Sequence, residues 1–445
     1  MTSCRMEKSL VRVVAFLILF CHDILDAEYI CPTPTQCYCF HNREVDCLNF
    51  DLRSIPHFEP KNHTFEAIDL GQNRFRTIPA NAFRHLRVKE LYVWENRRNI
   101  TVDRDAFNGL GEYLEYLQLK DNREITSLPR GLFRSMSKLV ALELQHNRLR
   151  FLQPFSFKGA LSLEHLDLAK NHLTYLQDHT FRGLFALTEL KLSANDIKYI
   201  SAKAFLGLHS LLKLKLDRNA IRDLQPRTFR RLEKLTELDL SSNNMSAIFP
   251  LMFKGLRQLQ TLDLTNNPIE LIADSTFATM ESLTELVIDK TKLSHLRPGM
   301  FRGLKNLREL SLYHNNIHDI SDDLFLGLPS LWKLYLDYNH LQTVNPCAFD
   351  NIENLKMISV TGNPIHCDCA MSWTSHDTSP EIVGQCMSPM SEKKTPISKQ
   401  ERYHVCTFTG MECEQLPGRN TKNQPLRLWL RYRRAYRQDP ASFNG

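Results

Sequence analysis

Cysteine and histidine are the residues of this chain whose side chains could carry covalent or metal chemistry. Six of the twelve cysteines fall before residue 50, none lies between residues 48 and 346, and six lie between residues 347 and 413. Thiols grouped in this way form disulfides or, with nearby histidines, a zinc site. Because the two groups are confined to the two ends, we favour disulfides that close the ends of a central region that needs no disulfide of its own.

Metal and enzyme chemistry are both disfavoured. A zinc site at His366, Cys367 and Cys369 conflicts with the secretion signal described below, because secreted cysteines are usually oxidised. His146, His165 and His314 occupy expected strand positions that face solvent, but no paired nucleophile recurs beside any of them. The sequence also contains no phosphate loop, metalloprotease helix or nucleophile elbow. We therefore predict a protein that is not an enzyme and needs no metal or cofactor.

Residues 1–27 have the pattern of a secretory signal peptide. A basic start precedes the apolar run Val11 to Cys21, which is too short to cross a bilayer. Its removal leaves ten cysteines, an even number, which predicts five disulfides in a protein secreted to the extracellular space or matrix. We expect no transmembrane segment. The glycosylation triplets at Asn62, Asn99 and Asn244 agree with secretion.

The elements that position these residues repeat along the chain. Two ladders, one of asparagine and one of phenylalanine, step by 24 residues over most of their length, with Thr291 in the one odd asparagine slot. A fixed period of this size predicts a solenoid. The asparagine ladder is Asn73, Asn96, Asn122, Asn147, Asn171, Asn195, Asn219, Asn243, Asn267, Asn315, Asn339 and Asn363. The phenylalanine ladder is Phe83, Phe107, Phe133, Phe157, Phe181, Phe205, Phe229, Phe253, Phe277, Phe301, Phe325 and Phe349.

One unit shows why the repeats must stack. Leu238 and Leu240 alternate with polar residues, which predicts a short strand with one buried face. No unit can bury that face alone, so neighbouring strands form a parallel sheet, and Phe253 anchors the return segment. Asn243 ends the strand, where its amide can satisfy backbone groups of adjacent coils. Because threonine can do only part of this, we expect the coil at Thr291 to be weaker or to hold water.

These residues resemble the extracellular leucine-rich repeat family. The resemblance implies a leucine-rich repeat solenoid, an α/β-class horseshoe with a curved parallel β-sheet on the concave face, short irregular or 3-10 convex segments, and disulfide caps at both ends. It divides the chain into a signal peptide (1–27), an N-terminal cysteine-rich cap (28–60), thirteen leucine-rich repeats (61–363), a C-terminal cysteine-rich cap (364–413) and a basic, disordered tail (414–445).

The same resemblance implies how the cysteines pair. In the N-terminal cap it joins Cys31 to Cys39 and Cys37 to Cys47. In the C-terminal cap it joins Cys367 to Cys386 and Cys369 to Cys406. Thr374, where the family usually has leucine, and a short stretch between Cys369 and Cys386 depart from the family pattern. Cys347 and Cys413 are left to pair by elimination, while two free thiols or an intermolecular bridge stay open.

The strand pattern also predicts which residues the concave face exposes. Aromatic residues gather toward both ends, and exposed aromatics on a rigid sheet are typical of protein-binding hot spots. The alternative interpretation is that tyrosine simply suits strands. The middle carries mixed charge from residues such as Glu143, Asp167, Lys191, Lys215 and Asp239. The predicted ligand-binding residues are Tyr92, Trp94, Tyr116, Tyr313, His314, Tyr335 and Tyr338.

The tail after Cys413 is basic and contains no acidic residue between Gln415 and Gln438. Such a segment favours binding to sulfated glycosaminoglycan, because arginine forks match sulfate, and nucleic acid is excluded by compartment. A solvated tail without a partner, and processing at Arg431–Arg434 by a furin-type protease, stay open. The polyanion-binding residues are Arg419, Lys422, Arg427, Arg431, Arg433, Arg434 and Arg437.

In layout the chain is most similar to chondroadherin-type matrix proteins. The resemblance implies an extracellular matrix or cell-adhesion protein that binds a protein ligand or receptor on its concave face and glycosaminoglycan through its tail. It also allows a homodimer. The alternative is a soluble modulator that sequesters a growth factor, toxin or hydrolase, or a protein of innate immune recognition.

Overall fold

The structure, a computed structural model, describes residues 37–397 apart from 41–42, 59–63, 97–99, 322–323, 326, 350–351, 367–379 and 388–393. The predicted signal peptide and basic tail lie outside this range, as does every predicted polyanion-binding residue. Further predicted site residues outside the described part are Cys31, Cys367, Cys369, Cys406, Cys413, Asn62 and Asn99.

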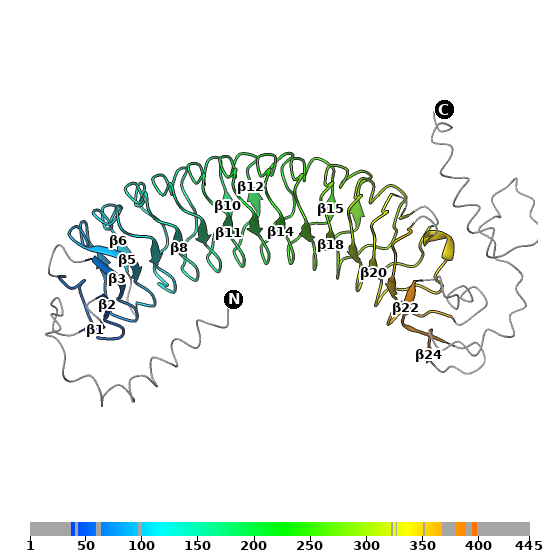
Figure 1. The fold of residues 1–445 in the computed structure, drawn as a ribbon, viewed down its shortest axis with the longest axis horizontal. Coiled ribbons are helices and arrows are strands. Elements are labelled where there is room, and N and C mark those ends of the chain that lie inside the picture. Colours follow the sequence, from blue (N-terminus) through cyan, green and yellow to red (C-terminus); the bar gives the residue numbers. More distant parts are fainter. Residues whose placement is uncertain are drawn as a thin grey trace, which may run out of the picture.

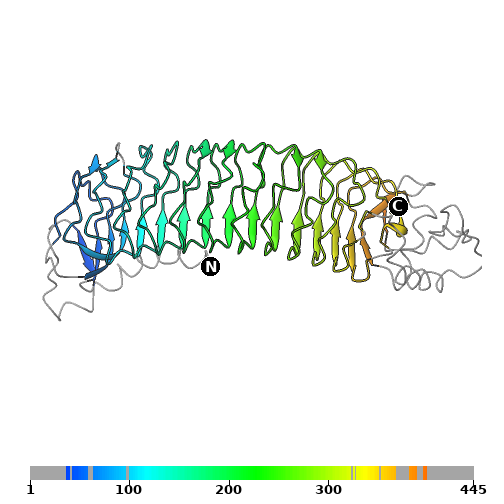
Figure 2. The ribbon, with the colours of Figure 1, turned by 90° about the horizontal axis from the view of Figure 1, so that it is seen from above.

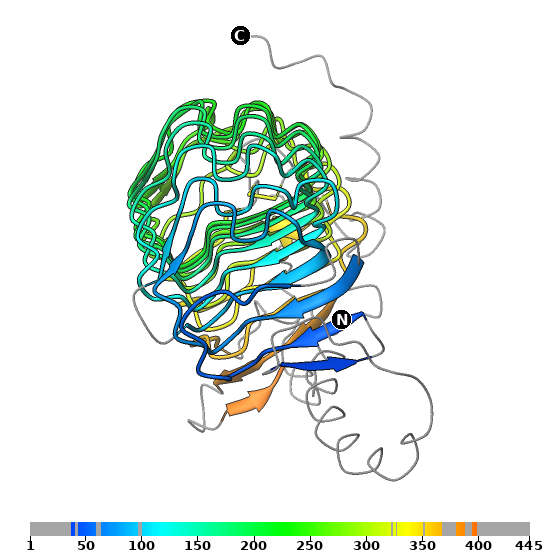
Figure 3. The ribbon, with the colours of Figure 1, turned by 90° about the vertical axis from the view of Figure 1, so that its left-hand side faces the viewer.

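A single 16-stranded sheet runs along the whole described arch. Thirteen of its strands, from β3 to β21, hold the repeat leucines and pair in parallel, as the sequence predicts. Figure 1 shows these strands along the inner curve, and Figure 3 shows the coils superimposed in an end-on view. The strands are β3 (Thr64–Asp69), β5 (Arg87–Tyr92), β7 (Tyr116–Gln118), β8 (Ala141–Glu143), β9 (His165–Asp167), β11 (Glu189–Lys191), β13 (Lys213–Lys215), β14 (Glu237–Asp239), β16 (Thr261–Asp263), β18 (Glu285–Val287), β19 (Glu309–Ser311), β20 (Lys333–Tyr335) and β21 (Met357–Ser359).

Each central strand buries one leucine and aligns it with its neighbours. Leu214, Leu238 and Leu262 are paired in register and fully buried. Parallel strands lie about 4.8 Å apart, so each coil covers the leucine of the next and no coil is stable alone. Burial of one leucine contributes roughly 1.5–3 kcal/mol, which makes this row a main source of stability.

The phenylalanine ladder forms a second row inside the solenoid. The rings of Phe181, Phe205 and Phe229 are stacked, with centroids 6.0 and 5.9 Å apart and interplanar angles of 5° and 19°. All three side chains are buried. Aromatic rings at such distances attract one another beyond the effect of their burial. The row therefore joins the return segments of successive coils.

The asparagine ladder joins consecutive coils by hydrogen bonds. The amide of Asn195 donates to the carbonyl of Leu168 at 3.0 Å and to that of Leu192 at 3.1 Å. Its Oδ1 atom accepts the backbone N–H of Leu173 at 3.0 Å. The asparagine thus satisfies backbone groups that the bend would leave unpaired in a buried place.

Thr291 breaks this pattern without leaving its own polar groups unpaired. Its hydroxyl and its backbone N–H, at 3.0 Å, both donate to Oδ1 of Asn315. The carbonyls of Leu264 and Ile288 receive the amides of Asn267 and Asn315. Each of these two carbonyls therefore accepts one side-chain hydrogen bond, whereas the equivalent carbonyl of a regular coil accepts two.

The convex side carries short strand pairs that the sequence did not predict. They are β4 (Thr77–Ile78) with β6 (Thr101–Val102), β10 (Tyr175–Leu176) with β12 (Tyr199–Ile200), and β15 (Ala247–Ile248) with β17 (Leu271–Ile272). Seen from above in Figure 2, they lie along the edge opposite the main sheet. The 3-10 helix η2 (Pro346–Phe349), which contains Cys347, lies in a later coil.

Both ends of the sheet extend beyond the repeats. The strand β2 (Glu44–Asp46) pairs in parallel with β3 and antiparallel with β1 (Tyr38–Phe40), and β22 (Glu381–Val383) pairs with β21. Beyond β22, β23 (Gln385–Met387) and β24 (Lys394–Pro396) form an antiparallel hairpin.

One predicted disulfide is present in full among the described residues. It joins Cys37 to Cys47, as the family resemblance implies. Cys39 and Cys386 are also disulfide-bonded, while the cysteines expected to pair with them lie outside the described part of the chain. The pairing of Cys347 with Cys413 stays a prediction.

Candidate ligand-binding face

The concave face is built from the residues that flank each buried leucine. In β14, Glu237 and Asp239 flank Leu238 and stay partly exposed. Register pairs Glu237 with Thr261 and Asp239 with Asp263, so that equivalent side chains of successive coils form rows along the arch. The face therefore presents one side chain per coil in each row, at the spacing of the strands.

A left-handed backbone position follows each strand. The residue before the ladder asparagine has φ of 54° at Ser242 and His314, 53° at Tyr338 and 59° at His146. His146 and His314 therefore lie in turns, and the prediction that they occupy strands was wrong because these strands span only three residues. His165 lies in β9 and is exposed, as predicted.

We call Tyr92, Trp94 and Tyr116 the N-terminal aromatic cluster, and two of its members, Tyr92 in β5 and Tyr116 in β7, contact each other. The rings of Tyr92 and Tyr116 lie 5.2 Å apart. The indole N–H of Trp94 donates to Oδ1 of Asp69 at 3.2 Å. A Cβ atom on Gly71 would collide with this indole, so the ring lies directly on the glycine of the preceding coil.

Hydrogen bonds hold the third member of this cluster in place. Gln118 donates to Tyr116 at 2.9 Å and to Glu143 at 2.8 Å. Burial and the hydrogen bond to Glu143 raise the pKa of Tyr116 above its usual value. Burial alone would raise the pKa of Glu143, but hydrogen bonds from Tyr116, Gln145 and Gln118 lower it. At neutral pH, Tyr116 is therefore a neutral donor to a charged carboxylate.

We call Tyr313, His314, Tyr335 and Tyr338 the C-terminal aromatic cluster; Tyr335 lies in β20, and the other three lie in the turns after β19 and β20. Tyr313 and Tyr338 lie 5.3 Å apart in an edge-to-face arrangement, and His314 stacks on Tyr338 at 6.3 Å. Tyr338 is 51% exposed, whereas Tyr335 and Tyr313 are half-buried. A Cβ atom on Gly362 would lie 2.8 Å from the ring of Tyr338, which again places an aromatic ring on a glycine of the neighbouring coil.

Asp289 supports this cluster and Trp332 is a further exposed aromatic residue, and neither was predicted from the sequence. The carboxylate of Asp289 accepts the hydroxyl of Ser311 at 2.6 Å and the backbone N–H of Tyr313 at 2.9 Å, which fixes the turn that carries Tyr313. Burial raises the pKa of Asp289. Trp332 is 48% exposed, and the ammonium of Lys333 lies 5.3 Å from its ring. An aromatic residue directly after the first repeat leucine was the signal for Trp332.

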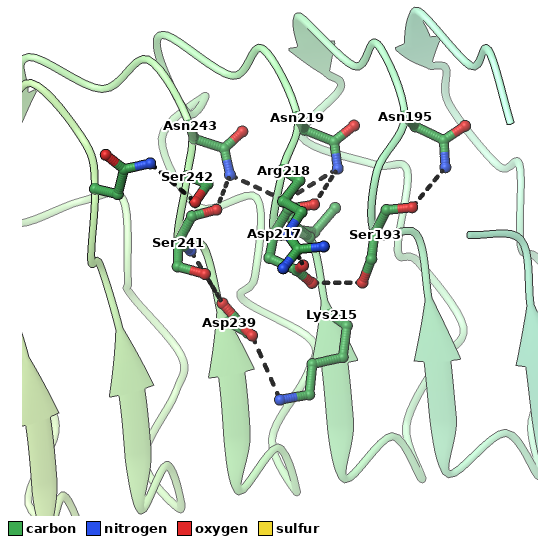
Figure 4. Close-up of polar contacts among 12 residues, drawn as sticks. Ser193, Asn195, Lys215, Asp217, Arg218, Asn219, Asp239, Ser241, Ser242 and Asn243 are labelled. Carbon is green, nitrogen blue, oxygen red and sulfur yellow. Dashed lines mark hydrogen bonds and ion pairs between the residues drawn. The ribbon is translucent and has the colours of Figure 1, made fainter. Parts of the chain in front are cut away.

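The charged middle of the face is largely paired with itself. Lys215 contacts Glu237 and lies 3.5 Å from Asp239, and Lys213 lies 3.7 Å from Glu237. Figure 4 shows Lys215 extending across the strands toward Asp239, and Asp217 meeting Ser193 of the preceding coil. Although burial lowers it, hydrogen bonds to Glu237 and Asp239 leave the pKa of Lys215 raised. This region therefore offers a ligand few unpaired charges.

The described residues show no arrangement suited to metal binding or membrane crossing. No group of three His, Cys, Asp or Glu among them could hold a metal ion, and no helix in this part is long and apolar enough to span a bilayer. Asn244 is exposed, as a glycan acceptor must be. Its glycosylation stays a prediction.

Known proteins resemble this chain at the level of the repeat. Nine overlapping matches to the leucine rich repeat family together cover residues 87–365, more than half of the chain. A stretch of 108 residues is 32% identical to the follicle-stimulating hormone receptor of Cairina moschata, and covers 23% of this chain and 15% of the receptor. Another of 115 residues is 35% identical to the human leucine-rich repeats and immunoglobulin-like domains protein 1, and covers 25% and 10%. The matched part thus spans less than a fifth of these relatives' own length.

Solved structures share the fold at lower identity. A leucine-rich repeat protein of Leptospira interrogans is 24% identical with a TM-score of 0.60, over 78% of this chain and 86% of that one. A chain of the octameric complex of latrophilin 3, Unc5D and FLRT2 is 21% identical with a TM-score of 0.55, over 84% and 99%. The ladders, the parallel sheet and the family matches agree: the chain belongs to the leucine rich repeat family, whose members are typically non-catalytic scaffolds for protein interactions.

Proposed function

We propose that this protein is a secreted, non-catalytic scaffold of the extracellular matrix or of cell adhesion that binds a protein ligand on its concave face. The observation that carries the proposal is the pair of aromatic clusters on either side of a self-paired charged centre. Aromatic side chains provide large contact area with little loss of conformational entropy, and they dominate the binding energy of protein interfaces. The paired centre contributes register and rejects partners of mismatched charge.

A protein ligand also agrees with the relatives. Their names and titles include a hormone receptor, a complex with latrophilin 3 and Unc5D, and a complex of Toll with Spatzle. For this chain we propose the same class of ligand and no particular member of it.

The finer layout of the proposal rests on the sequence. It comprises a signal peptide at 1–27, disulfide caps at 28–60 and 364–413 around thirteen repeats, and a basic tail at 414–445 that binds sulfated glycosaminoglycan. This arrangement is most similar to that of chondroadherin-type matrix proteins. In it the concave face selects a protein partner and the tail holds the molecule in the matrix.

The test makes two measurements on protein secreted by cultured cells: its retention in the cell layer during extraction with rising salt, and its capture of a protein partner from that layer. Full-length protein, a form ending at Glu414, and the triple variant Tyr313→Ala, Tyr335→Ala, Tyr338→Ala are compared. A matched control replaces Tyr175, Phe185 and Tyr199 by alanine, because these residues are 41–55% exposed but lie outside the two clusters. The proposal expects the shortened form to elute at lower salt and the triple variant to lose capture of a protein partner, while the control behaves as the full-length protein.

Two results would contradict parts of the proposal. If full-length and shortened protein both appear freely in the medium, the tail is no matrix anchor and the soluble modulator takes its place. If the triple variant and its control capture partners equally, the C-terminal aromatic cluster has no role in binding.

A further inference from the structure

A hollow with a volume of about 420 Å³ opens beside the main sheet, where the chain turns away after β8 and β9. The five side chains in its lining that carry or can acquire positive charge are Arg123, His146, Arg148, Lys170 and His172. No carboxylate belongs to the lining. The volume lies within the roughly 300–1,000 Å³ typical of small-ligand sites.

The repeat brings these cations together. Arg123, Arg148 and His172 each follow a ladder asparagine, so they occupy the same position in three successive coils. His146 and Lys170 each precede one, and both have the left-handed backbone that turns the chain away from the sheet, with φ of 59° and 54°. Since coils are spaced about 4.8 Å apart at the sheet, the two rows place their positive groups within reach of one small anion or of neighbouring anionic groups on a chain.

The positive charge of the hollow is only partly neutralised. Arg148 lies 3.3 Å from Glu124, His172 lies 3.1 Å from Asp196, and His146 contacts Asp121. Among the described residues, neither Arg123 nor Lys170 has an ion-pair partner, and both side chains are exposed. Two full positive charges therefore face the hollow without a counterion from the protein.

We propose that this hollow binds sulfate groups of an extracellular polyanionic glycan, at a site separate from the basic tail. The inference deepens the glycosaminoglycan binding of the proposed function and rests on it. An arginine fork matches the tetrahedral oxygens of sulfate, and lysine adds a point charge. Ala194 is the one apolar side chain in the lining, so the hollow lacks the hydrophobic anchors that a peptide or an acyl chain would need.

The experiment titrates the full-length protein with a short heparin oligosaccharide and measures Kd. The hollow variant carries Arg123→Ser and Lys170→Ser, and the tail variant carries Arg433→Ser and Arg434→Ser. A matched control with Arg230→Ser and Lys254→Ser removes the same charge from exposed positions that do not line the hollow. All substitutions in the described part are at exposed residues, and thermal unfolding checks that each variant folds.

The hollow variant is expected to bind at least about tenfold more weakly, because two charge-assisted contacts are lost, while the control stays within about twofold of the parent protein. The hollow and tail variants combined should lose more than either alone. Heparin stripped of its sulfates should bind both the parent protein and the hollow variant weakly and equally.

Three outcomes overturn the inference. If the hollow variant binds like the parent and the tail variant loses all binding, the tail alone holds the glycan and the proposed function survives. If the parent itself does not bind heparin, the glycan part of the proposed function fails together with the hollow. If inorganic phosphate or sulfate displaces the oligosaccharide at equal concentration of anionic groups, the hollow holds any tetrahedral anion and is no glycan site.

Discussion

Two aromatic rings of the clusters on the concave face lie on glycines of neighbouring coils. Trp94 covers Gly71 and Tyr338 covers Gly362, in both cases so closely that a methyl group in place of the glycine hydrogen would overlap the ring. A side chain held from below in this way loses little entropy on binding, which is what a hot spot requires. The absence of a side chain at Gly71 and Gly362 therefore preorganises the rings of Trp94 and Tyr338 for binding.

Substituting Gly71 by alanine should displace the indole of Trp94 and destabilise the protein by about 1–3 kcal/mol, as overpacking usually does. Tryptophan fluorescence and urea unfolding would report the two effects. In a Trp94→Ala background the same substitution should be nearly neutral, because the collision is gone. A full loss of stability in that background would show that Gly71 matters for another reason.

The stability of the protein should depend on pH through Asp167. Burial raises the pKa of this carboxyl although the N–H of Ala169 donates to it at 2.9 Å. The folded protein therefore holds the proton more tightly than the unfolded chain, and this favourable contribution is present at low pH and lost as pH rises through the folded-state pKa. Asp167→Asn, which keeps the acceptor, should stabilise the protein at pH 7 and have little effect at pH 3. Urea unfolding at both values would check this, and equal effects at both would contradict it.

At the scale of the element, the asparagine ladder determines how well one coil is joined to the next. Asn267 donates to carbonyls of two coils, those of Leu240 and Leu264, at 2.9 and 3.0 Å. Thr291 uses its hydroxyl on Asn315 instead and gives no amide to the preceding coil. The joint at Thr291 thus has fewer side-chain hydrogen bonds than the joint one coil earlier.

Thr291→Asn should restore the missing bonds and stabilise the protein by about 0.5–1.5 kcal/mol, the net value of a typical hydrogen bond. The reverse change at the preceding coil, Asn267→Thr, should destabilise it by a similar amount or more. Both are measured by urea unfolding at neutral pH. If Thr291→Asn destabilises the protein, the coil has adapted its packing to threonine.

The period of the ladders was sufficient to predict these elements, because a leucine, an asparagine and a phenylalanine at constant spacing have one arrangement that buries all three. The parallel sheet and its register were predicted from the sequence for this reason. The contact of Trp94 with Gly71 was not, because it depends on side-chain packing between coils in a region where the asparagines are 23, 26 and 25 residues apart. The basic hollow was not predicted either, because Arg123 and Lys170 are distant in sequence and line one hollow only when the coils stack.

At the scale of the whole molecule, stability is the sum of the interaction energies between neighbouring coils. Contacts run from each coil to the next along the sheet, the phenylalanine row and the asparagine ladder, and the convex strand pairs also join neighbouring coils. Such an array responds to a local defect locally. The consequence can be tested in the middle of the arch.

Phe205→Ala should remove one ring from the continuous row between Phe181 and Phe229 and cost about 3–5 kcal/mol. Hydrogen exchange measured by mass spectrometry should show the loss of protection concentrated in the coils around residue 205. The same substitution at Phe349, in the last coil of the row, should weaken only that end. A uniform loss along the whole arch in either case would contradict the additive description.

The direction of the hydrogen bonds in the sheet also has a mechanical consequence. The strands lie across the arch, so the bonds between them point along its length, from one coil to the next (Figure 2). A force that pulls the two ends apart therefore loads these joints in series, and every joint carries the full tension. The weakest connection between two coils should therefore separate first. The connection at Thr291 has fewer side-chain hydrogen bonds, so we expect extension to begin there.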